Sequence, residues 1–384
     1  MLIVLGQMST SLYTPSLPSM AEALAADPSE VKLTMTVFLL AFAIAQLVYG
    51  PLADRLGRRP TLIGGLLIYV LGTLVCALAP TLLVLILGRA IQAIGACAAP
   101  AIARAVVRDR YDRSEAARVW SVIGLAMAAG PVLGPLLGGK LQVLFGWRAG
   151  FVFLVLFGLA MLVAVIQYLV ESLAEPDPNA TDLSRLAVNS AVLLSDRSYV
   201  GYCLIVGFCF GGLFAYTTGA PFVLIELIGL QPDVFGSLFL FTVAGYAIGM
   251  AASGQLVRRL DLDLLIAIGA VIMVLGGGAM WAVVETGHLS TALIVGTMSI
   301  YTLGFGVVLP NAMAAAMAPY PGMAGMASAW LGFAQMGVAA LGSYAVGLLY
   351  DQTATPVAAI VAISAVGVGL ALLLLVRPGR KAAA

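Results

Sequence analysis

Charged residues are scarce in this chain. Asp, Glu, Lys and Arg make up 10% of its 384 residues, whereas soluble proteins average about 25%. Hydrophobic residues make up 62%, and the mean hydropathy is +1.06. A soluble protein of this length has no interior large enough to bury so much apolar surface. The scarcity of charge therefore excludes a soluble globular protein and predicts that the lipid bilayer is the solvent.

The chain also has no excess of charge of one sign, no cluster of cysteines and only one histidine. The net charge of +1 argues against a nucleic-acid partner. The one histidine, His288, falls in a predicted outer loop, and the four cysteines fall inside apolar runs without metal-type spacing. We therefore expect no disulfide, no metal and no cofactor. No buried constellation of histidine, acid and nucleophile occurs, so an enzyme is not predicted.

A phosphate-binding loop is also missing, although residues 134–141 nearly spell one. Gly139 and Lys140 stand at the required spacing from Gly134, but Leu141 replaces the Ser or Thr that would hold magnesium, and no strand precedes the segment. Direct use of ATP is therefore not expected, and secondary transport fits better.

The chain has long apolar runs instead. A membrane span needs roughly 20 apolar residues, and about twelve such runs are present; all should be helical because lipid offers the backbone no hydrogen-bond partner. The first run lacks a basic leader and is interpreted as a retained span, not a cleaved signal peptide. The predicted spans are 2–24, 33–53, 61–79, 82–105, 118–141, 149–170, 199–225, 235–256, 263–284, 291–317, 324–349 and 356–376.

The basic residues give an orientation. Of the 19 Lys and Arg residues, all but Lys32, Arg89, Lys140 and Arg148 fall in loops or the tail on one predicted side. By the positive-inside rule this side is cytoplasmic. We therefore expect an integral protein of the bacterial inner membrane with both termini in the cytoplasm.

Two halves of the chain repeat each other. Residues 50–56 align with 254–260 at an offset of 204, and residues 13–18 align with 216–221 at an offset of 203. Parallel repeats of this kind pack around an axis along the membrane normal. The predicted fold is an all-α integral membrane protein with 12 transmembrane helices in two six-helix bundles related by a pseudo-two-fold. We expect an N-terminal bundle over 1–171, a polar cytoplasmic linker over 172–197 and a C-terminal bundle with a short tail over 198–384.

The turn at residues 50–60 is more than a basic turn. An acid at the end of span 2 can pair with an arginine or lie at the N-terminus of another helix, and such modest contacts suit a latch that opens. Asp109, at the inner end of span 4, either belongs to a set of helix-end anchors or shares an ion-pair network with this turn. The candidate latch residues are Gly50, Asp54, Arg55, Gly57, Arg58, Arg59 and Asp109.

Arg89 is a basic residue well inside a predicted span, with Gln92 one turn further on the same face. A charge within the membrane is costly and by default faces a cavity or a partner. The alternative is that Arg89 extends its side chain to the outer interface.

Span 5 carries small residues every four positions. Such a stripe lets helices approach closely, and prolines loosen the helix. The stripe consists of Gly130, Gly134 and Gly138, with Pro131 beside the first glycine.

These motifs resemble signatures of the major facilitator superfamily. The turn at 50–60 resembles its motif A, the segment around Arg89 its span-4 signature, and the stripe of span 5 its antiporter signature, motif C. The resemblance implies that Asp54 helps to hold an inner gate shut, that Arg89 is linked to proton coupling and that transport is export.

Segments along nearly the whole chain resemble the bicyclomycin and chloramphenicol resistance branch (Bcr/CflA) of the twelve-span drug:proton antiporters. They are residues 13–18, 104–109, 219–226, 311–313 and 321–325. That branch typically carries an aspartate where this chain has Ser11, and a buried acid is the simplest proton carrier. Three readings stay open: Glu226 or Asp54 carries the proton, the protein is uncoupled or differently coupled, or Ser11 replaces an acid in an engineered sequence.

The hypothesis from sequence is a secondary exporter that exchanges small apolar or amphipathic drugs for protons by alternating access, acting as a monomer in the lipid bilayer. An importer or facilitator of the same fold, and a receptor without transport, are the alternatives. Met and aromatic faces suit varied apolar ligands. The candidate cavity residues are Gln7, Ser11, Tyr13, Phe38, Phe42, Met127, Phe210, Phe214, Tyr216, Asn311 and Gln335.

Overall fold

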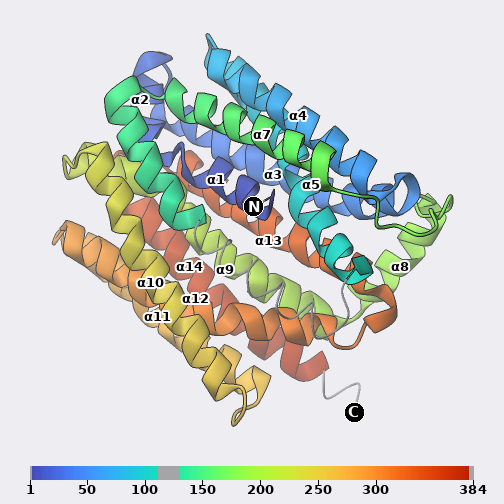
Figure 1. Cartoon of the computed structure of the whole chain (residues 1–384). Coiled ribbons are helices and arrows are strands. Elements are labelled where there is room, and N and C mark those ends of the chain that lie inside the picture. The colour runs from blue at the N-terminus through green and yellow to red at the C-terminus, as the bar shows by residue number, and fades with distance from the viewer. Residues whose placement is uncertain (1, 111–129, 380–384) are drawn as a thin grey trace. The chain divides into compact units, whose positions relative to one another are not determined.

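The computed structural model describes residues 2–110 and 130–379, and these residues are almost entirely helical (Figure 1). The described part of the chain contains no strand, which confirms the predicted all-α class. The residues form two compact units. Unit 1 comprises Met1–Leu186 and Gln231–Ser237, and unit 2 comprises Ala187–Leu230 and Leu238–Ala384.

Unit 1 contains most of the first half of the chain. Its helices are α1 (Leu2–Ser11), a 3-10 turn (Thr14–Ser16), α2 (Leu17–Ala23), α3 (Pro28–Leu56), α4 (Arg58–Leu78), α5 (Leu82–Arg110), a helix over residues 130–145, and α7 (Arg148–Tyr168). Within this unit α5 packs against α3 and α4, α4 packs against α7, and α1 packs against α5. α5 is therefore the central helix of the site described below.

Unit 2 holds the second half. Its helices are α9 (Arg197–Pro221), which continues as a π-helix (Phe222–Leu227), most of α10 (Pro232–Leu256), α11 (Leu262–Glu285), α12 (Thr291–Met317), a 3-10 turn (Pro321–Met323), α13 (Ala324–Leu348), and α14 (Thr355–Ala371), which continues as a π-helix (Leu372–Val376). α9 packs against α13 and α14, and α11 packs against α12.

Ten helices of the described residues are long and apolar enough to cross a membrane, against twelve predicted spans. The two differences have separate causes. The first predicted span is interrupted at Thr14–Ser16, so that α1 and α2 are each shorter than a span. The fifth begins in residues outside the described ranges and is helical from residue 130.

The segment after α7 contains a helix of its own. The polar stretch 172–197, predicted as a linker, includes α8 (Leu183–Ser195). Leu193 of α8 is buried, while several other apolar residues of this helix are exposed. The division between the two units falls within α8.

Both ends of α3 have a local explanation, and its second end forms the sharp turn predicted at residues 50–60. α3 begins at a capping box, in which the Asp27 side chain accepts from Ser29 N at 2.7 Å, and Glu30 accepts from the backbone N–H of Asp27. It ends at Gly57, whose φ of +99° suits a residue without a Cβ. α4 then starts at the next residue. One glycine therefore reverses the chain between two spans.

Candidate functional site

Arg89 is completely buried in unit 1, with a relative exposure of 0%. Its Nη1 atom donates to the carbonyl oxygen of Ser9 at 2.9 Å and to Oε1 of Gln92 at 2.6 Å. The side chain does not reach the surface, so the structure excludes its extension to the outer interface. The spacing of Arg89 and Gln92, read from sequence as one helix face, brings the two side chains into contact.

Two aromatic rings cover Arg89. The guanidinium carbon lies 4.2 Å from the centroid of the Tyr13 ring and 4.1 Å from that of the Phe38 ring. Tyr13 follows α1 and Phe38 belongs to α3, so two other segments of the unit hold the cation. Sequence reasoning assigned both rings to a drug cavity, whereas in this structure they contact Arg89.

Further hydrogen bonds fix this cluster from α4. Gln92 Nε2 donates to Thr73 Oγ1 at 3.0 Å, and Thr73 Oγ1 donates to the carbonyl oxygen of Tyr69 at 2.6 Å. The Tyr69 hydroxyl lies 2.9 Å from Ser9 Oγ. We call Ser9, Tyr13, Phe38, Tyr69, Thr73, Arg89 and Gln92 the arginine cluster. Its contacts join α1, α3, α4 and α5 and Tyr13, which follows α1.

The charge of Arg89 has no acidic partner among the described residues. A guanidinium keeps its proton in proteins, and burial of an ion costs several kcal/mol. A desolvated cation–π contact returns about 2 kcal/mol per ring, and Nη1 has its two carbonyl acceptors. The Nε and Nη2 atoms are buried and have no hydrogen-bond partner in the part of the chain that the structure describes. The cluster therefore orients the cation without neutralising it.

The glycine stripe of the helix over 130–145 lies against α1. A Cβ added to Gly130 would lie 2.7 Å from Gln7 Cβ, and one added to Gly134 or Gly138 would overlap Ser11 Oγ or the carbonyl oxygen of Leu12. Ser11 Oγ donates to the carbonyl oxygen of Gln7 at 2.8 Å and lies 3.3 Å from that of Gly130. Only glycine permits this approach.

The candidate cavity residues that the structure describes are distributed over both units. Phe42 stacks on Phe38 in unit 1, with ring centroids 6.1 Å apart. In unit 2, Phe210 stacks on Phe214 at 6.3 Å. Asn311 is buried and donates through Nδ2 to Ser253 Oγ at 2.7 Å.

Other candidates lie elsewhere. Tyr216 is buried near Phe239, with ring centroids 6.2 Å apart. Gln335 is half-buried on α13. Glu226 is exposed in the π-helix after α9. Met127 lies outside the described residues.

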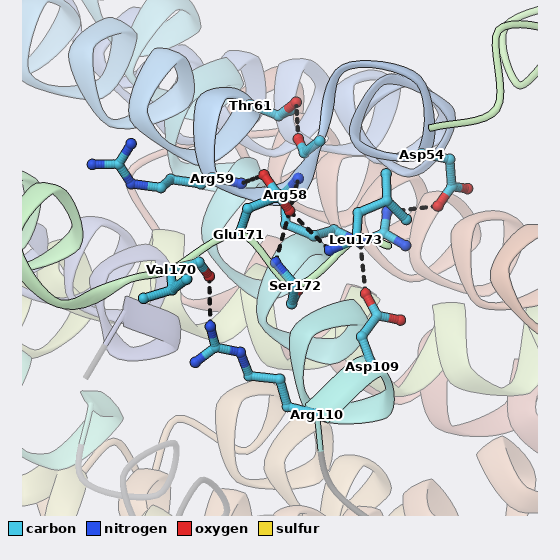
Figure 2. Close-up of polar contacts among 11 residues, drawn as sticks. Asp54, Arg58, Arg59, Thr61, Asp109, Arg110, Val170, Glu171, Ser172 and Leu173 are labelled. Carbon is cyan, nitrogen blue, oxygen red and sulfur yellow. Dashed lines mark hydrogen bonds and ion pairs between the residues drawn. The ribbon is translucent and has the colours of Figure 1, made fainter. Parts of the chain in front are cut away.

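A second cluster lies where α3 meets α4 and α5 ends (Figure 2). Arg58 Nη1 lies 2.6 Å from Asp54 Oδ1, and Arg58 Nε lies 3.0 Å from Asp109 Oδ2. The Arg58 side chain is 3% exposed, that of Asp109 15% and that of Asp54 46%. The structure thus brings Asp109 together with the 50–60 turn, and the less exposed Asp109 pair is the stronger of the two because water screens it less.

Sequence reasoning missed a carboxylate in this second cluster. Glu171 accepts from the backbone N–H groups of Arg58 and Arg59, each at 3.0 Å, and from those of Ser172 and Leu173 (Figure 2). Partial burial would raise the pKa of Glu171, but these four donors outweigh it, so that its pKa is lowered. Glu171 therefore stabilises the first turn of α4, whose own cap residue, Gly57, has no side chain.

Other arginines tie the same region together. Arg59 Nη2 donates to the carbonyl oxygen of Ile166 at 2.9 Å, and Arg110 Nη2 donates to that of Val170 at 2.8 Å. Arg55 Nη1 donates to Thr181 Oγ1 at 2.7 Å. We call Asp54, Arg55, Arg58, Arg59, Asp109, Arg110 and Glu171 the charge cluster. Gly50, a candidate from sequence, is exposed with open space around its Cα.

Comparison with known families gives a match over most of the chain. A model of the Major Facilitator Superfamily matches residues 1–343. Solved structures share the fold: the partially occluded inward open xylose transporter XylE from E. coli superposes with a TM-score of 0.73 at 14% identity, over 98% of this chain and 96% of that one.

Individual relatives cover most of their own lengths. The chain is 33% identical over 370 residues to the uncharacterized MFS-type transporter YdgK of Bacillus subtilis (strain 168), covering 95% of this chain and 91% of the relative. It is 28% identical over 332 residues to multidrug resistance protein D of Escherichia coli (strain K12), covering 86% and 83%. It is 27% identical over 364 residues to a bicyclomycin resistance protein homolog of Haemophilus influenzae (strain ATCC 51907 / DSM 11121 / KW20 / Rd), covering 92% and 89%.

Proposed function

Because the chain belongs to the major facilitator superfamily and is an integral membrane transporter, we propose that it exports small apolar or amphipathic drugs from the cytoplasm in exchange for protons. Two of its relatives bear the names of a multidrug resistance protein and a bicyclomycin resistance protein homolog. The chain, with two halves predicted as residues 1–171 and 198–384, works by alternating access. The transporter works as a monomer with both termini in the cytoplasm.

The contact of the glycine stripe with α1 carries this proposal. The same α1 segment that meets Gly130 and Gly134 also supplies Ser9 to the arginine cluster and leads to Tyr13. A shift of the 130–145 helix along α1 therefore changes the surroundings of Arg89. This gives a physical route by which drug movement and the charge state of the site become coupled.

The charge cluster is the proposed inner gate. Its contacts join α3, α4 and α5 through ion pairs and reach the segment after α7 through Glu171. The pair with Asp54 is half-exposed, and pairs of that kind contribute roughly 0–1 kcal/mol, so this contact is weak enough to open during a transport cycle. Asp54 and Asp109 hold the gate in the outward-facing state.

A facilitator without proton coupling is the second candidate, because of Ser11. Its hydroxyl is engaged with the backbone of α1 and of the 130–145 helix, and it cannot carry a proton as an acid would. Coupling then requires an acid elsewhere, with Asp54 and Glu226 as the candidates.

Efflux from proteoliposomes tests the proposal. Ethidium efflux is measured with an imposed proton gradient, with the gradient collapsed by an uncoupler, and for the Arg89→Ala variant. We expect gradient-driven efflux by the wild type, loss of it with the uncoupler and loss of it in Arg89→Ala. Efflux that ignores the uncoupler would favour the facilitator, and normal efflux by Arg89→Ala would remove Arg89 from coupling.

Proton release on drug binding separates the readings of Ser11. Detergent-solubilised wild type and Ser11→Asp are mixed with ethidium in weak buffer, and the pH change is recorded. A response by the wild type supports an acid elsewhere in the chain. Proton release by Ser11→Asp alone means that the wild-type protein lacks a proton-carrying acid. No proton release by either protein would refute the antiport proposal.

A further inference from the structure

One edge of the Arg89 guanidinium is unused. Nη1 is held by Ser9 and Gln92, whereas Nε and Nη2 have no hydrogen-bond partner among residues 2–110 and 130–379. Nε and Nη2 carry parallel N–H groups along the same side of the planar group. This is the edge with which arginine binds a carboxylate through two parallel hydrogen bonds.

The rest of the cluster holds that edge in a fixed direction. Gln92 is itself anchored by Thr73, and the Ser9 carbonyl belongs to α1. The rings of Tyr13 and Phe38 contact the guanidinium, while the hydrogen-bonding capacity of its buried Nε and Nη2 edge stays unused in the part of the chain that the structure describes. A site of this kind is already organised for an anion, so little is spent on ordering it when a ligand arrives.

The described part of the chain does not supply the anion. In the described residues no carboxylate contacts Arg89. The segment 111–129 contains acids only at Asp112 and Glu115, both before the predicted start of span 5 at residue 118. A buried cation without a counter-charge attracts any anion that reaches it, because the surroundings screen the charge weakly.

We propose that the Nε and Nη2 edge of Arg89 binds the carboxylate of a flat, amphipathic substrate in a bidentate geometry beside Tyr13 and Phe38. This deepens the proposed function, on which it rests, by naming a substrate class: aromatic carboxylates. The carboxylate meets the guanidinium edge, and the aromatic body of the substrate meets apolar and aromatic side chains. Substrates without an acid bind elsewhere or more weakly.

A matched pair of ligands tests this on the wild type alone. Binding of 2-naphthoate and of its neutral amide, 2-naphthamide, to the detergent-solubilised protein is measured by calorimetry at pH 7. The two compounds share the ring system and differ in the anionic group. We expect the carboxylate to bind on the order of ten- to a hundredfold more tightly, as hydrogen bonds between two charged groups allow. Equal binding, or binding of neither compound, overturns the proposal.

Two variants locate the preference. Arg89→Gln should abolish the preference for naphthoate, and Arg89→Lys, which keeps the charge but not the paired N–H groups, should reduce it about tenfold. The matched control is Arg148→Gln. Arg148 also stacks on a ring, 4.1 Å from the Trp147 centroid, but donates to the carbonyl oxygen of Ala79 outside the cluster. A preference that survives Arg89→Gln, or that is lost in Arg148→Gln, contradicts the assignment.

Failure of this inference is distinguishable from failure of the proposed function. If naphthoate and naphthamide bind alike while ethidium efflux responds to the proton gradient, the exporter stands and the anion site falls. If naphthoate binds through Arg89 while no compound is driven outwards by protons, the site stands and the direction or coupling of transport is wrong.

Discussion

The helix pair α4 and α5 in unit 1 has a counterpart in α11 and α12 of unit 2. A Cβ added to Gly72 would lie 2.3 Å from the backbone nitrogen of Gln92, and one added to Gly276 would lie 2.5 Å from that of Tyr301. A Cβ on Gly95 would lie 2.2 Å from the nitrogen of Tyr69, and one on Gly304 2.7 Å from that of Met273. The two pairs share the same backbone contacts.

The side chains between these contacts differ. Arg89 and Gln92 precede Gly95 by six and three residues, and Met298 and Tyr301 precede Gly304 by the same spacing. Met298 is fully buried, and the Tyr301 hydroxyl donates to the carbonyl oxygen of Cys209 at 3.2 Å. One copy packs without a charge at this position. The comparison leads us to expect that Arg89 is present for function and not for packing.

Exchange of the two residues is expected to give the largest effect. Met298→Arg places a cation in unit 2 where methionine packs, and an uncompensated buried charge costs about 3–5 kcal/mol. Arg89→Met removes a charge and fills the space, which is nearly neutral for stability, while gradient-driven efflux is lost. Thermal unfolding in detergent and efflux from proteoliposomes measure the two effects.

The opposite results for Arg89→Met and Met298→Arg would contradict this comparison of the two helix pairs. A large loss of stability in Arg89→Met would mean that unit 1 needs the cation for packing. A Met298→Arg variant as stable as wild type would mean that unit 2 has partners for a charge.

Glycine contacts should give the next largest effect. Gly72→Ala and Gly276→Ala force a methyl group onto a backbone that cannot move aside, and overpacking of this kind costs about 1–3 kcal/mol. Gly64→Ala on α4 and Gly278→Ala on α11 are the matched controls, because a Cβ at either position meets nothing within 4 Å. The controls should be neutral or slightly stabilising, since alanine favours the helix.

Equal melting temperatures for the Gly72→Ala and Gly64→Ala proteins would show that the helices can separate at little cost. A loss confined to one unit would show that the two pairs are packed less alike than their backbones indicate.

Much of this architecture was predictable because the bilayer constrains it. Apolar runs predicted most spans to within a few residues: span 291–317 coincides with α12 (Thr291–Met317). The repeat was predicted at offsets of 203 and 204, but the pair Gln92 and Tyr301 is related by 209, because both the end of α11 and the connection to α12 are longer than those of α4 and α5. Motifs near one end of a repeat do not report such an insertion.

The contacts that the sequence did not reveal join residues that lie far apart along the chain. Glu171 lies more than 100 positions from the backbone it caps, and no local pattern links the two. The one sign of this capping role in the sequence was an acid directly after an apolar run. Tyr13 and Phe38 were assigned to a drug cavity from residue type, because a ring that faces a cation looks the same in sequence as one that faces a ligand.

The inner ends of the two repeats also differ. Asp54 in unit 1 corresponds to Arg258 in unit 2, which is exposed. Within unit 1, Asp109→Asn should destabilise the protein by about 2 kcal/mol, since it removes a charged partner of the buried Arg58. Asp54→Asn, at a half-exposed pair, should cost less than about 1 kcal/mol. Thermal unfolding of both variants gives the order.

The same variants address the gate. Both should increase labelling of a cysteine introduced on the cytoplasmic side, with the larger increase in Asp109→Asn. Arg258→Gln is the matched control in unit 2 and should change neither quantity. A greater effect of Asp54→Asn would reverse the assignment of the stronger pair.

The starts of α4 and α11 provide the smallest and most specific contrast. α11 has Asp261 at its cap position, where the side chain makes no cap hydrogen bond, whereas α4 follows Gly57 and its first N–H groups donate to Glu171. The pKa of Glu171 is lowered from its ordinary value of 4.5, so its carboxylate stabilises the folded state above about pH 4.5, and this contribution is lost as the pH falls through the lowered pKa. Glu171→Gln should therefore cost about 1 kcal/mol at pH 7, reduced by the exposure of the side chain, and almost nothing at low pH.

Melting temperatures of the Glu171→Gln protein and the wild type between pH 3 and pH 7 measure this difference. Asp261→Asn is the control and should lack the pH-dependent difference. A pH-independent loss in Glu171→Gln would mean that the side chain acts through packing and not through its charge.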